Sequence, residues 1–346
     1  MQEITISTRT VLRIVALSLG LIFLSFLLWE MSQVVLVFFA AVLIAILLDG
    51  GAGLFERFLH MKHPWSFLLA LATIAGLSGL FFYLLGTQIN EQFSGLSGRF
   101  PQIIDDLGAR FGIDDLSSDL LERASALGSG SGVLTRIAGL TSGVMGILSS
   151  VALAVVAGIY MGARPDVYAG GLRSLVPKQH VHQADEWMRN SGNALRLWLL
   201  GQFVSMLAIG VLTGLGLWAL GMPSALALAF LAGVAAFVPI VGPILSAIPA
   251  LLIAMSEGDG ALVQVALLYL GVQQVESYLV TPVVQRKAVD LPPVFTLFAI
   301  LALGLLFGGL GIILAAPLSV VMLVSIRQLY IREALEKPAD IPGRDD

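Results

Sequence analysis

The chain has 346 residues, of which 57% are hydrophobic and only 12% are charged, with a formal net charge of -4. Soluble domains carry about 25% charged residues, so this composition excludes a soluble protein and predicts helices that face lipid or one another. The small net charge leaves no basic footprint for nucleic acid, and the absence of cysteine excludes disulfides and thiolate metal sites. The chain is therefore predicted to be an all-α polytopic membrane protein.

Three spans and a polar insert are predicted in the first part of the chain. The first membrane unit, residues 1–86, has its hydrophobic windows at 11–29, 34–54 and 65–86. Residues 87–140 are richer in acidic side chains and place apolar residues at helical spacing. They are expected to form an extracytoplasmic amphipathic insert, which either caps the protein's own membrane face or contacts another subunit.

The second part of the chain is predicted to contain the transport core. A fourth span at 141–163 leads into a cytoplasmic connector at 164–194, the core occupies 195–327, and a cytoplasmic tail follows at 328–346. Alternation of the spans places most Lys and Arg residues on one side, which the positive-inside rule identifies as the cytoplasm. Both termini are therefore expected in the cytoplasm, with the protein in the inner (plasma) membrane.

Two segments of the core, 224–255 and 293–325, are unusually long and are each interrupted midway by Gly and Pro. A single helix of that length would measure about 48 Å against a hydrocarbon core of about 30 Å. The flanking Lys and Arg residues also follow the positive-inside rule better if each segment enters and leaves on the same face of the membrane. Re-entrant hairpins are therefore favoured over long kinked helices. The predicted hairpin tips contain Pro239, Gly242 and Pro243 in the first segment and Gly308, Gly309 and Gly311 in the second.

An internal repeat connects these two segments. With continuous spans at 195–220 and 261–284, the chain has eight hydrophobic segments, and a shift of 69 positions aligns Gly242 with Gly311. Each copy contains one span and one hairpin, and the two hairpins enter from opposite faces, which makes an inverted repeat. The competing explanation is chance similarity between two apolar, Gly-rich segments.

Glu276 is the clearest ionisable residue inside a predicted span. A charge near the centre of a membrane helix costs about 2.5–3.5 kcal/mol, so it normally faces an interior cavity and marks an ion or substrate path. Gln273 shares its face, and Ser277 and Thr281 belong to a second polar strip of the same helix. Gln202 of the preceding span is expected to line the same cavity. The alternatives are a structural carboxyl at Glu276 and a simple helix–helix hydrogen bond at Gln202.

No enzymatic signature accompanies these residues. The chain has no Walker-type glycine loop, no serine nucleophile elbow and no zincin helix. Its four histidines lack a nearby carboxylate cluster, so no metal site is predicted. Neither an enzyme activity nor a cofactor is expected, and energy is predicted to come from a solute or ion gradient, with H⁺ or Na⁺ as the coupling ion.

The second half of the chain resembles the autoinducer-2 exporter family, also described as PerM-like permeases. The motifs that carry this resemblance are residues 200–202, 221–223, 238–243 with 248–250, 273–276, 280–282, 306–311 and 316–318. The resemblance implies a membrane transporter, with some members linked to autoinducer-2 export and others to exchange of sodium or lithium for protons.

Three functional hypotheses follow for this chain. The first is a secondary transporter that exports a small polar, autoinducer-2-like molecule by alternating access, with its substrate site between two hairpins. The second is an Na⁺(Li⁺)/H⁺ antiporter that uses Glu276 as its exchange carboxylate. The third is a non-transport membrane scaffold that works through its outer insert. The expected partners are the lipid bilayer, a small-molecule or cation substrate and further copies of the chain, without nucleic acid.

Overall fold

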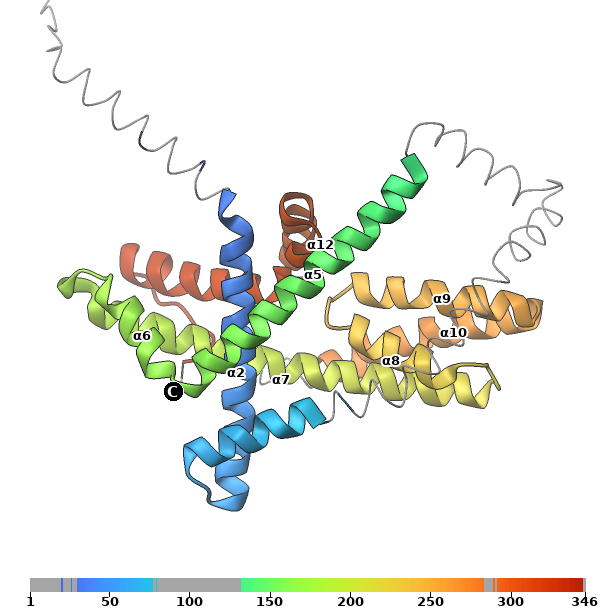
Figure 1. Ribbon diagram of the computed structural model, residues 1–346, viewed down its shortest axis with the longest axis horizontal. Helices are drawn as coiled ribbons and strands as arrows, with labels where there is room; N and C mark the ends of the chain where they lie inside the picture. The colour runs from blue at the N-terminus through green and yellow to red at the C-terminus, as the bar shows by residue number, and fades with distance from the viewer. Residues whose placement is uncertain are drawn as a thin grey trace, which may run out of the picture.

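The protein folds into helices that pack beside one another and are crossed by α2 (Figure 1). This computed structural model describes residues 30–76, 132–282 and 291–344, with the single residues 20, 26, 79 and 289. The regular structure in those ranges is helical, without a strand. Three of the described helices are long and apolar enough to cross a membrane, and one bent pair provides a fourth candidate. The all-α class predicted from composition is therefore confirmed, with helices of membrane-spanning length.

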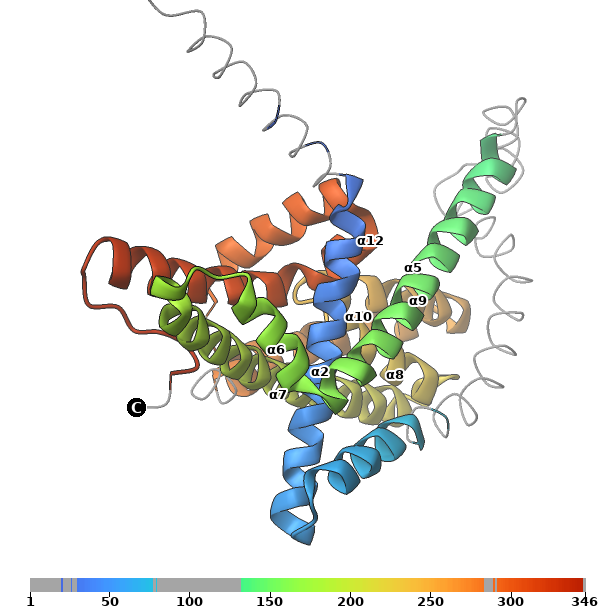
Figure 2. The ribbon, with the colours of Figure 1, turned by 60° about the vertical axis from the view of Figure 1, so that its left-hand side comes forward.

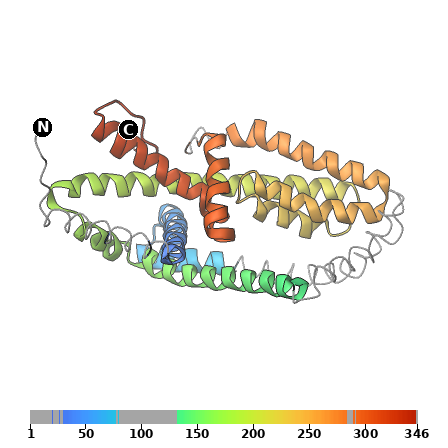
Figure 3. The same cartoon turned by 90° about the horizontal axis from the view of Figure 1, so that it is seen from above.

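The first half of the described chain is organised around α2, which spans Ser32–Leu59. His60 ends this helix in the left-handed conformation, with φ of 52°, and the chain returns through a helix at 63–76. Phe67 of the returning helix is buried against α2. α5 (Gly132–Ala163) packs across another side of α2, so that Figure 3 shows α2 nearly end-on beside α5.

A sharp bend separates α5 from the helices that follow. The chain turns by 91° into the short helix α6 (Pro165–Ser174), then passes through η1 (Lys178–His180) into α7 (Val181–Ala219). At 1.5 Å per residue, α7 is about 58 Å long, which exceeds a hydrocarbon core of about 30 Å. α7 thus runs without interruption from the predicted connector into the predicted fifth span.

α8 (Ala225–Ala235) and α9 (Val241–Glu257) form a helical hairpin. The backbone N–H of Gly242 donates a hydrogen bond to the carbonyl of Val238 at 2.9 Å, which closes the turn between the two helices. A Cβ atom at position 242 would collide with the backbone carbonyl of Ala235. Glycine is therefore required here because the end of α8 and the start of α9 approach each other closely.

α10 packs against α9 and α7 and then changes its helical pitch. It spans Asp259–Val275 and continues directly as the π-helical segment η2, Glu276–Val280. Buried apolar residues, including Leu217, Leu228 and Val265, connect α7, α8 and α10. This packing holds η2 beside α7, where the two helices contact each other.

α12 (Pro293–Ser325) is interrupted near its middle. Gly308 has φ of 63° and ψ of -143°, a non-helical conformation that divides α12 into two helical halves. A Cβ atom on Gly311 would collide with the carbonyl of Leu303, so the chain folds back closely after this break, as Figure 2 shows for the two halves of α12. The second half continues into the π-helical segment η3, Ile326–Ala334.

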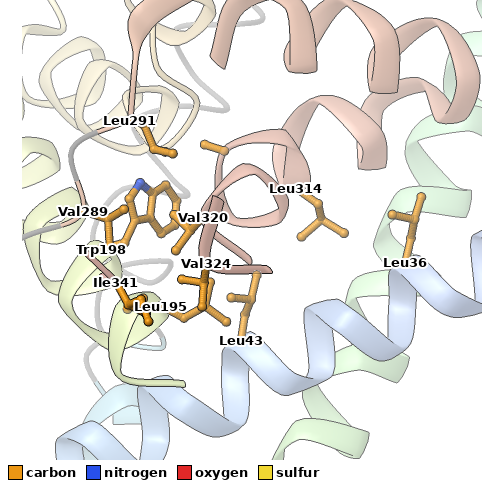
Figure 4. Packing of buried hydrophobic residues seen from close by; sticks show 12 residues of the cluster. Leu36, Leu43, Leu195, Trp198, Val289, Leu291, Leu314, Val320, Val324 and Ile341 are labelled. Atoms are coloured by element: carbon orange, nitrogen blue, oxygen red, sulfur yellow. The ribbon is translucent and has the colours of Figure 1, made fainter. Parts of the chain in front are cut away.

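The largest buried cluster lies where α2, α7, the second half of α12 and the C-terminal residues meet (Figure 4). Leu43 of α2, Leu195 of α7 and Val324 of α12 contribute to it, and Ile341 is only 4% exposed. Association of membrane helices is driven by van der Waals packing and not by removal of surface from water, so this close packing stabilises the contact between elements far apart in the sequence.

Polar side chains extend the contact between the N-terminal part of α7 and the chain from the end of α12 through η3. The indole Nε1 of Trp187 donates to Ser325 Oγ at 2.9 Å, and Asn190 Nδ2 donates to Gln328 Oε1 at 2.9 Å. Nearer the periphery, a guanidinium nitrogen of Arg332 bonds a carboxylate oxygen of Glu186 at 2.6 Å. These bonds fix the direction in which the chain leaves α12.

We expect the contribution of the Glu186–Arg332 pair to disappear in acid. The hydrogen bond from Arg332 holds the pKa of Glu186 below its usual value of 4.5, so the pair stabilises the fold above that pH and loses this effect as the pH falls through the lowered pKa. Because both side chains are about 30% exposed, the contribution is under about 1 kcal/mol. Glu186→Gln should lower the melting temperature slightly at neutral pH and have no effect in acid.

Thermal melting in detergent at neutral and acidic pH measures this difference. Arg332→Gln supplies the matched background, in which Glu186→Gln should cause no further pH-dependent loss. If the melting temperature of the wild type exceeded that of Glu186→Gln by more in acid than at neutral pH, the stabilising role assigned to the Glu186–Arg332 pair would be contradicted.

The structure can be compared with the predicted segments only where it describes them. Almost all of the predicted span at 11–29 and residues 87–131 of the predicted insert lie outside the described residues. α5 begins at Gly132, within the range predicted for the insert. The segment at 224–255 corresponds to α8 and α9, and the segment at 293–325 corresponds to the broken helix α12.

Candidate functional site

A cavity of about 300 Å³ lies between α7, the turn of the α8–α9 hairpin, η2 and both halves of α12. Among the described residues that line it, Glu276 provides the only ionisable side chain. Neutral polar side chains and apolar residues form the remaining wall. The sequence-predicted residues that the structure brings together here are Gln202, Pro239, Pro243, Gln273, Glu276, Ser277 and Thr281.

Three neighbouring side chains donate hydrogen bonds to the Glu276 carboxylate. Thr281 Oγ1 donates to Oε1 at 2.7 Å, while Gln273 Nε2 and Ser277 Oγ both donate to Oε2, at 3.1 and 3.4 Å. A carboxylate has about four acceptor positions, so three donors leave room for one more partner. The arrangement fixes the carboxylate orientation and leaves acceptor capacity for a proton, a cation or a solute hydroxyl.

The π-helical turn explains why Thr281 reaches this carboxylate. In an α-helix, a residue five positions after Glu276 would lie on a different face. In η2 the backbone N–H of Thr281 donates to the carbonyl of Glu276, the i to i+5 pattern of a π-helix, which aligns the two side chains. The two polar strips expected from α-helical spacing therefore merge into one group around Glu276. Pro282, which has no backbone N–H, directly follows this turn.

The turn of the α8–α9 hairpin forms another wall of the cavity. Ile240 lies between the cavity-lining prolines and has φ of 68° and ψ of -53°, a strained conformation for a β-branched residue. Gln202 Nε2 donates a hydrogen bond to the carbonyl of Ala236 at 2.6 Å, which ties α7 to the start of the turn. Gln202 thus makes a helix–helix bond and also lines the cavity, so its two expected roles coexist.

The sequence reasoning missed several residues of the wall, although α7 carried a usable signal. Trp198, Ser205 and Ile209 line the cavity and lie four residues before, three after and seven after Gln202, on the same helical face. The Trp198 ring packs edge-on against Phe237, with ring centroids 5.8 Å apart. No comparable periodicity identifies Thr296, because it belongs to the segment after η2 that folding brings to the cavity.

The predicted second tip lies away from this lining. Gly308, Gly309 and Gly311 occupy the break of α12 and are absent from the cavity wall, while Ala316 from the second half of α12 contributes to that wall. Gly242 also does not line the cavity. It packs instead against the backbone of Ala235 at the end of α8. The two tips therefore differ in their relation to the cavity.

The donor set of the cavity restricts which ions it suits. Within the described part of the chain, no three His, Cys, Asp or Glu side chains gather into a metal-binding group. The oxygen atoms of Glu276, Ser277 and Thr281 are hard ligands, which suit a hard cation better than a transition metal. The site can accept a proton, a monovalent cation or the hydroxyl and amino groups of a small polar solute.

Apolar helices broken at glycine and a cavity with one carboxylate are features of membrane transporters. Sequence comparison agrees with this class. The chain belongs to the AI-2E family of transporters, because the family model described as "AI-2E family transporter" matches residues 15–331. The family predicted from the motifs is thereby confirmed.

Individual relatives are also transport proteins by name. The chain is 33% identical to "Putative transport protein YrrI" of Bacillus subtilis (strain 168) over 150 residues, which cover 43% of this chain and 42% of YrrI. "Putative transport protein MT0215" of Mycobacterium tuberculosis (strain CDC 1551 / Oshkosh) is 32% identical over 187 residues, 51% of each chain. These matches span about half the length of each relative. "Putative transport protein YueF" of Bacillus subtilis (strain 168) is 23% identical over 312 residues, which cover 82% of this chain and 84% of YueF.

Proposed function

We propose that the protein is a secondary transporter of the inner membrane that exports a small polar, autoinducer-2-like molecule. The observation that carries this proposal is the cavity of about 300 Å³ whose Glu276 carboxylate is held by three donors and retains acceptor capacity. A small solute with hydroxyl groups can donate to Glu276 and exchange hydrogen bonds with the neutral polar side chains. The surrounding apolar wall would exclude bulk water from the bound solute.

The proposed topology has eight hydrophobic segments, cytoplasmic termini and two re-entrant hairpins in an inverted repeat. Two features of the tips support the repeat. Gly242 and Gly311, 69 positions apart, both pack closely against a backbone carbonyl of the preceding helix. Each tip also contains a positive-φ residue just before that glycine, Ile240 in one and Gly308 in the other. The backbone conformations differ, with ψ of -53° at Ile240 and -143° at Gly308, so the close contact between glycine and carbonyl is the stronger argument for common geometry over chance similarity.

Alternating access in this scheme comes from movement of α7–α12 against α2 and α5. α7 to α10 are closely packed together and carry most of the cavity wall, whereas α2 and α5 pack mainly against each other. Such a division allows one group to move as a unit while the other remains fixed, and further copies of the chain would hold the fixed group in a homo-oligomer.

An Na⁺(Li⁺)/H⁺ antiporter is the second candidate. The observation that favours it is the set of oxygen atoms around Glu276, with Ser277 Oγ 3.4 Å and Thr281 Oγ1 2.7 Å from carboxylate oxygens. These oxygens can coordinate a hard cation when their hydroxyl protons turn away, and the same carboxylate can carry a proton when the cation leaves.

Two flux measurements on purified protein in proteoliposomes separate these candidates. The first follows autoinducer-2 efflux from loaded vesicles, and the second follows internal pH after Na⁺ or Li⁺ is added outside. Efflux without cation-driven proton movement is expected for the exporter. Cation-driven proton movement without efflux would replace the exporter by the antiporter. Silence in both assays, with protein-free liposomes as the baseline, would exclude both solutes.

A further inference from the structure

The residues after η3 lie across α7 as an extended strap, which we define as residues 335–344. These residues are not helical, and they make one turn near their end. A guanidinium nitrogen of Arg327 donates to the carbonyl of Asp340 at 3.2 Å, and Asn193 Nδ2 donates to the carbonyl of Gly343 at 3.1 Å. One hydrogen bond thus attaches the strap to the start of η3 and the other attaches it to α7.

Ile341 inserts between these two attachment points into the largest buried cluster. It is 4% exposed and shares that cluster with Leu195, Trp198 and Val289. Figure 4 shows Ile341 beside Leu195, with Trp198 and Val289 next along the same cluster. Trp198 and Val289 also line the cavity. The buried cluster that contains Ile341 therefore also contributes two side chains to the wall of the proposed transport site.

Gly343 holds the strap tightly against α7. Its φ of 79° is left-handed, and an added Cβ atom would collide with the carbonyl of Asn190 and the backbone N–H of Ala194. A side chain at position 343 would thus push the strap away from α7 without removing any atom from the buried cluster. An extended segment held by a few contacts opens at a lower free-energy cost than a packed helix.

We propose that the strap closes the end of the cavity that Trp198 lines. Ile341 is then a positioning residue, whose packing holds the side chains of Trp198 and Val289 in the cavity wall. This end faces the cytoplasm in the proposed topology, and the inference rests on the proposed transport function. Release of the strap removes the packing behind Trp198 and Val289 and opens the cavity to the cytoplasmic side. Return of Ile341 restores the wall. The strap is then one of the two-state elements that alternating access requires.

Thiol accessibility tests this inference directly because the native chain has no cysteine. Ser205→Cys places one thiol in the cavity wall, at a residue that is 8% exposed. Its reaction rate with a membrane-impermeant maleimide is measured in inside-out vesicles, with Ile341→Ala or Gly343→Ala added. Both variants are expected to raise the labelling rate by about tenfold. This corresponds to a shift of about 1.4 kcal/mol in the equilibrium between the docked and the released strap, toward release.

Matched controls separate strap release from general loosening. Leu335→Ala truncates an exposed apolar residue of the same strap, and Ile341→Leu retains the buried volume, so both should keep the slow rate. Thermal melting verifies that each variant is folded, and labelling in denaturant verifies that the thiol reacts. An unchanged rate in folded Gly343→Ala would overturn the proposal, as would acceleration by Ile341→Ala alone. Labelling needs no transported solute, so failure of the strap is distinguishable from failure of the transport function.

Discussion

Replacement of Glu276 by glutamine is expected to lower transport by at least about tenfold while the protein remains folded. Glutamine has nearly the same shape, but it is neutral and presents an NH₂ group in place of one acceptor oxygen. Gln273 and Ser277 can still donate to the amide oxygen, and the Thr281 hydroxyl can turn to accept from the NH₂ group, so the fold is retained. The negative charge and the acceptor capacity of one carboxylate oxygen are lost. Hydrogen bonds to a charged group are worth about 1.5–3 kcal/mol, which corresponds to a loss of flux of about 10- to 150-fold.

The measurement is initial flux in proteoliposomes with matched amounts of folded protein. Glu257→Gln is the control, since Glu257 is an exposed acid at the end of α9 and outside the cavity wall. It should retain wild-type flux. Glu276→Asp retains the charge but shortens the reach to Thr281, so intermediate flux is expected. Full flux in Glu276→Gln would remove this carboxylate from the mechanism of both candidate transporters.

Composition was sufficient to predict helices that face lipid, because so few charged residues leave little surface for water. Residue spacing also predicted several residues of the cavity wall, since Gln273, Glu276 and Ser277 lie close together along one helix. Gln202 comes from another helix, and its placement beside them required the assumption of a repeat. The structure brings all four to one cavity, although their role in binding is still a proposal.

Other features depend on interactions that residue spacing does not encode. The π-helical turn that brings Thr281 to Glu276 departs from the α-helical period, so any prediction from that period separates the two residues. The position of Ile341 depends on a contact with α7 that is distant in sequence, and a single buried isoleucine in a polar tail has no periodic signal. Trp198 and Ser205, by contrast, share a helical face with Gln202 and were predictable from it.

Gly242→Ala is expected to prevent the α8–α9 hairpin from closing. The new methyl group would occupy the position of the Ala235 carbonyl, which belongs to the backbone and cannot rotate away as a flexible side chain could. Overpacking of this kind costs about 1–3 kcal/mol, and backbone displacement here would also move the cavity-lining turn at Ile240. Both a lower melting temperature and loss of flux are therefore expected from one added methyl group.

Gly271→Ala is the matched control, because Gly271 lies in α10 and an added Cβ atom has no neighbour within 4 Å. This change should raise the melting temperature slightly, since alanine favours a helix interior over glycine by up to about 1 kcal/mol. Gly311→Ala extends the test to the second tip, where the carbonyl of Leu303 blocks the same position. Comparable losses at Gly242 and Gly311 would support equivalent tips in an inverted repeat. A tolerated alanine at Gly311 would restrict the close backbone approach to the first hairpin and argue against that equivalence.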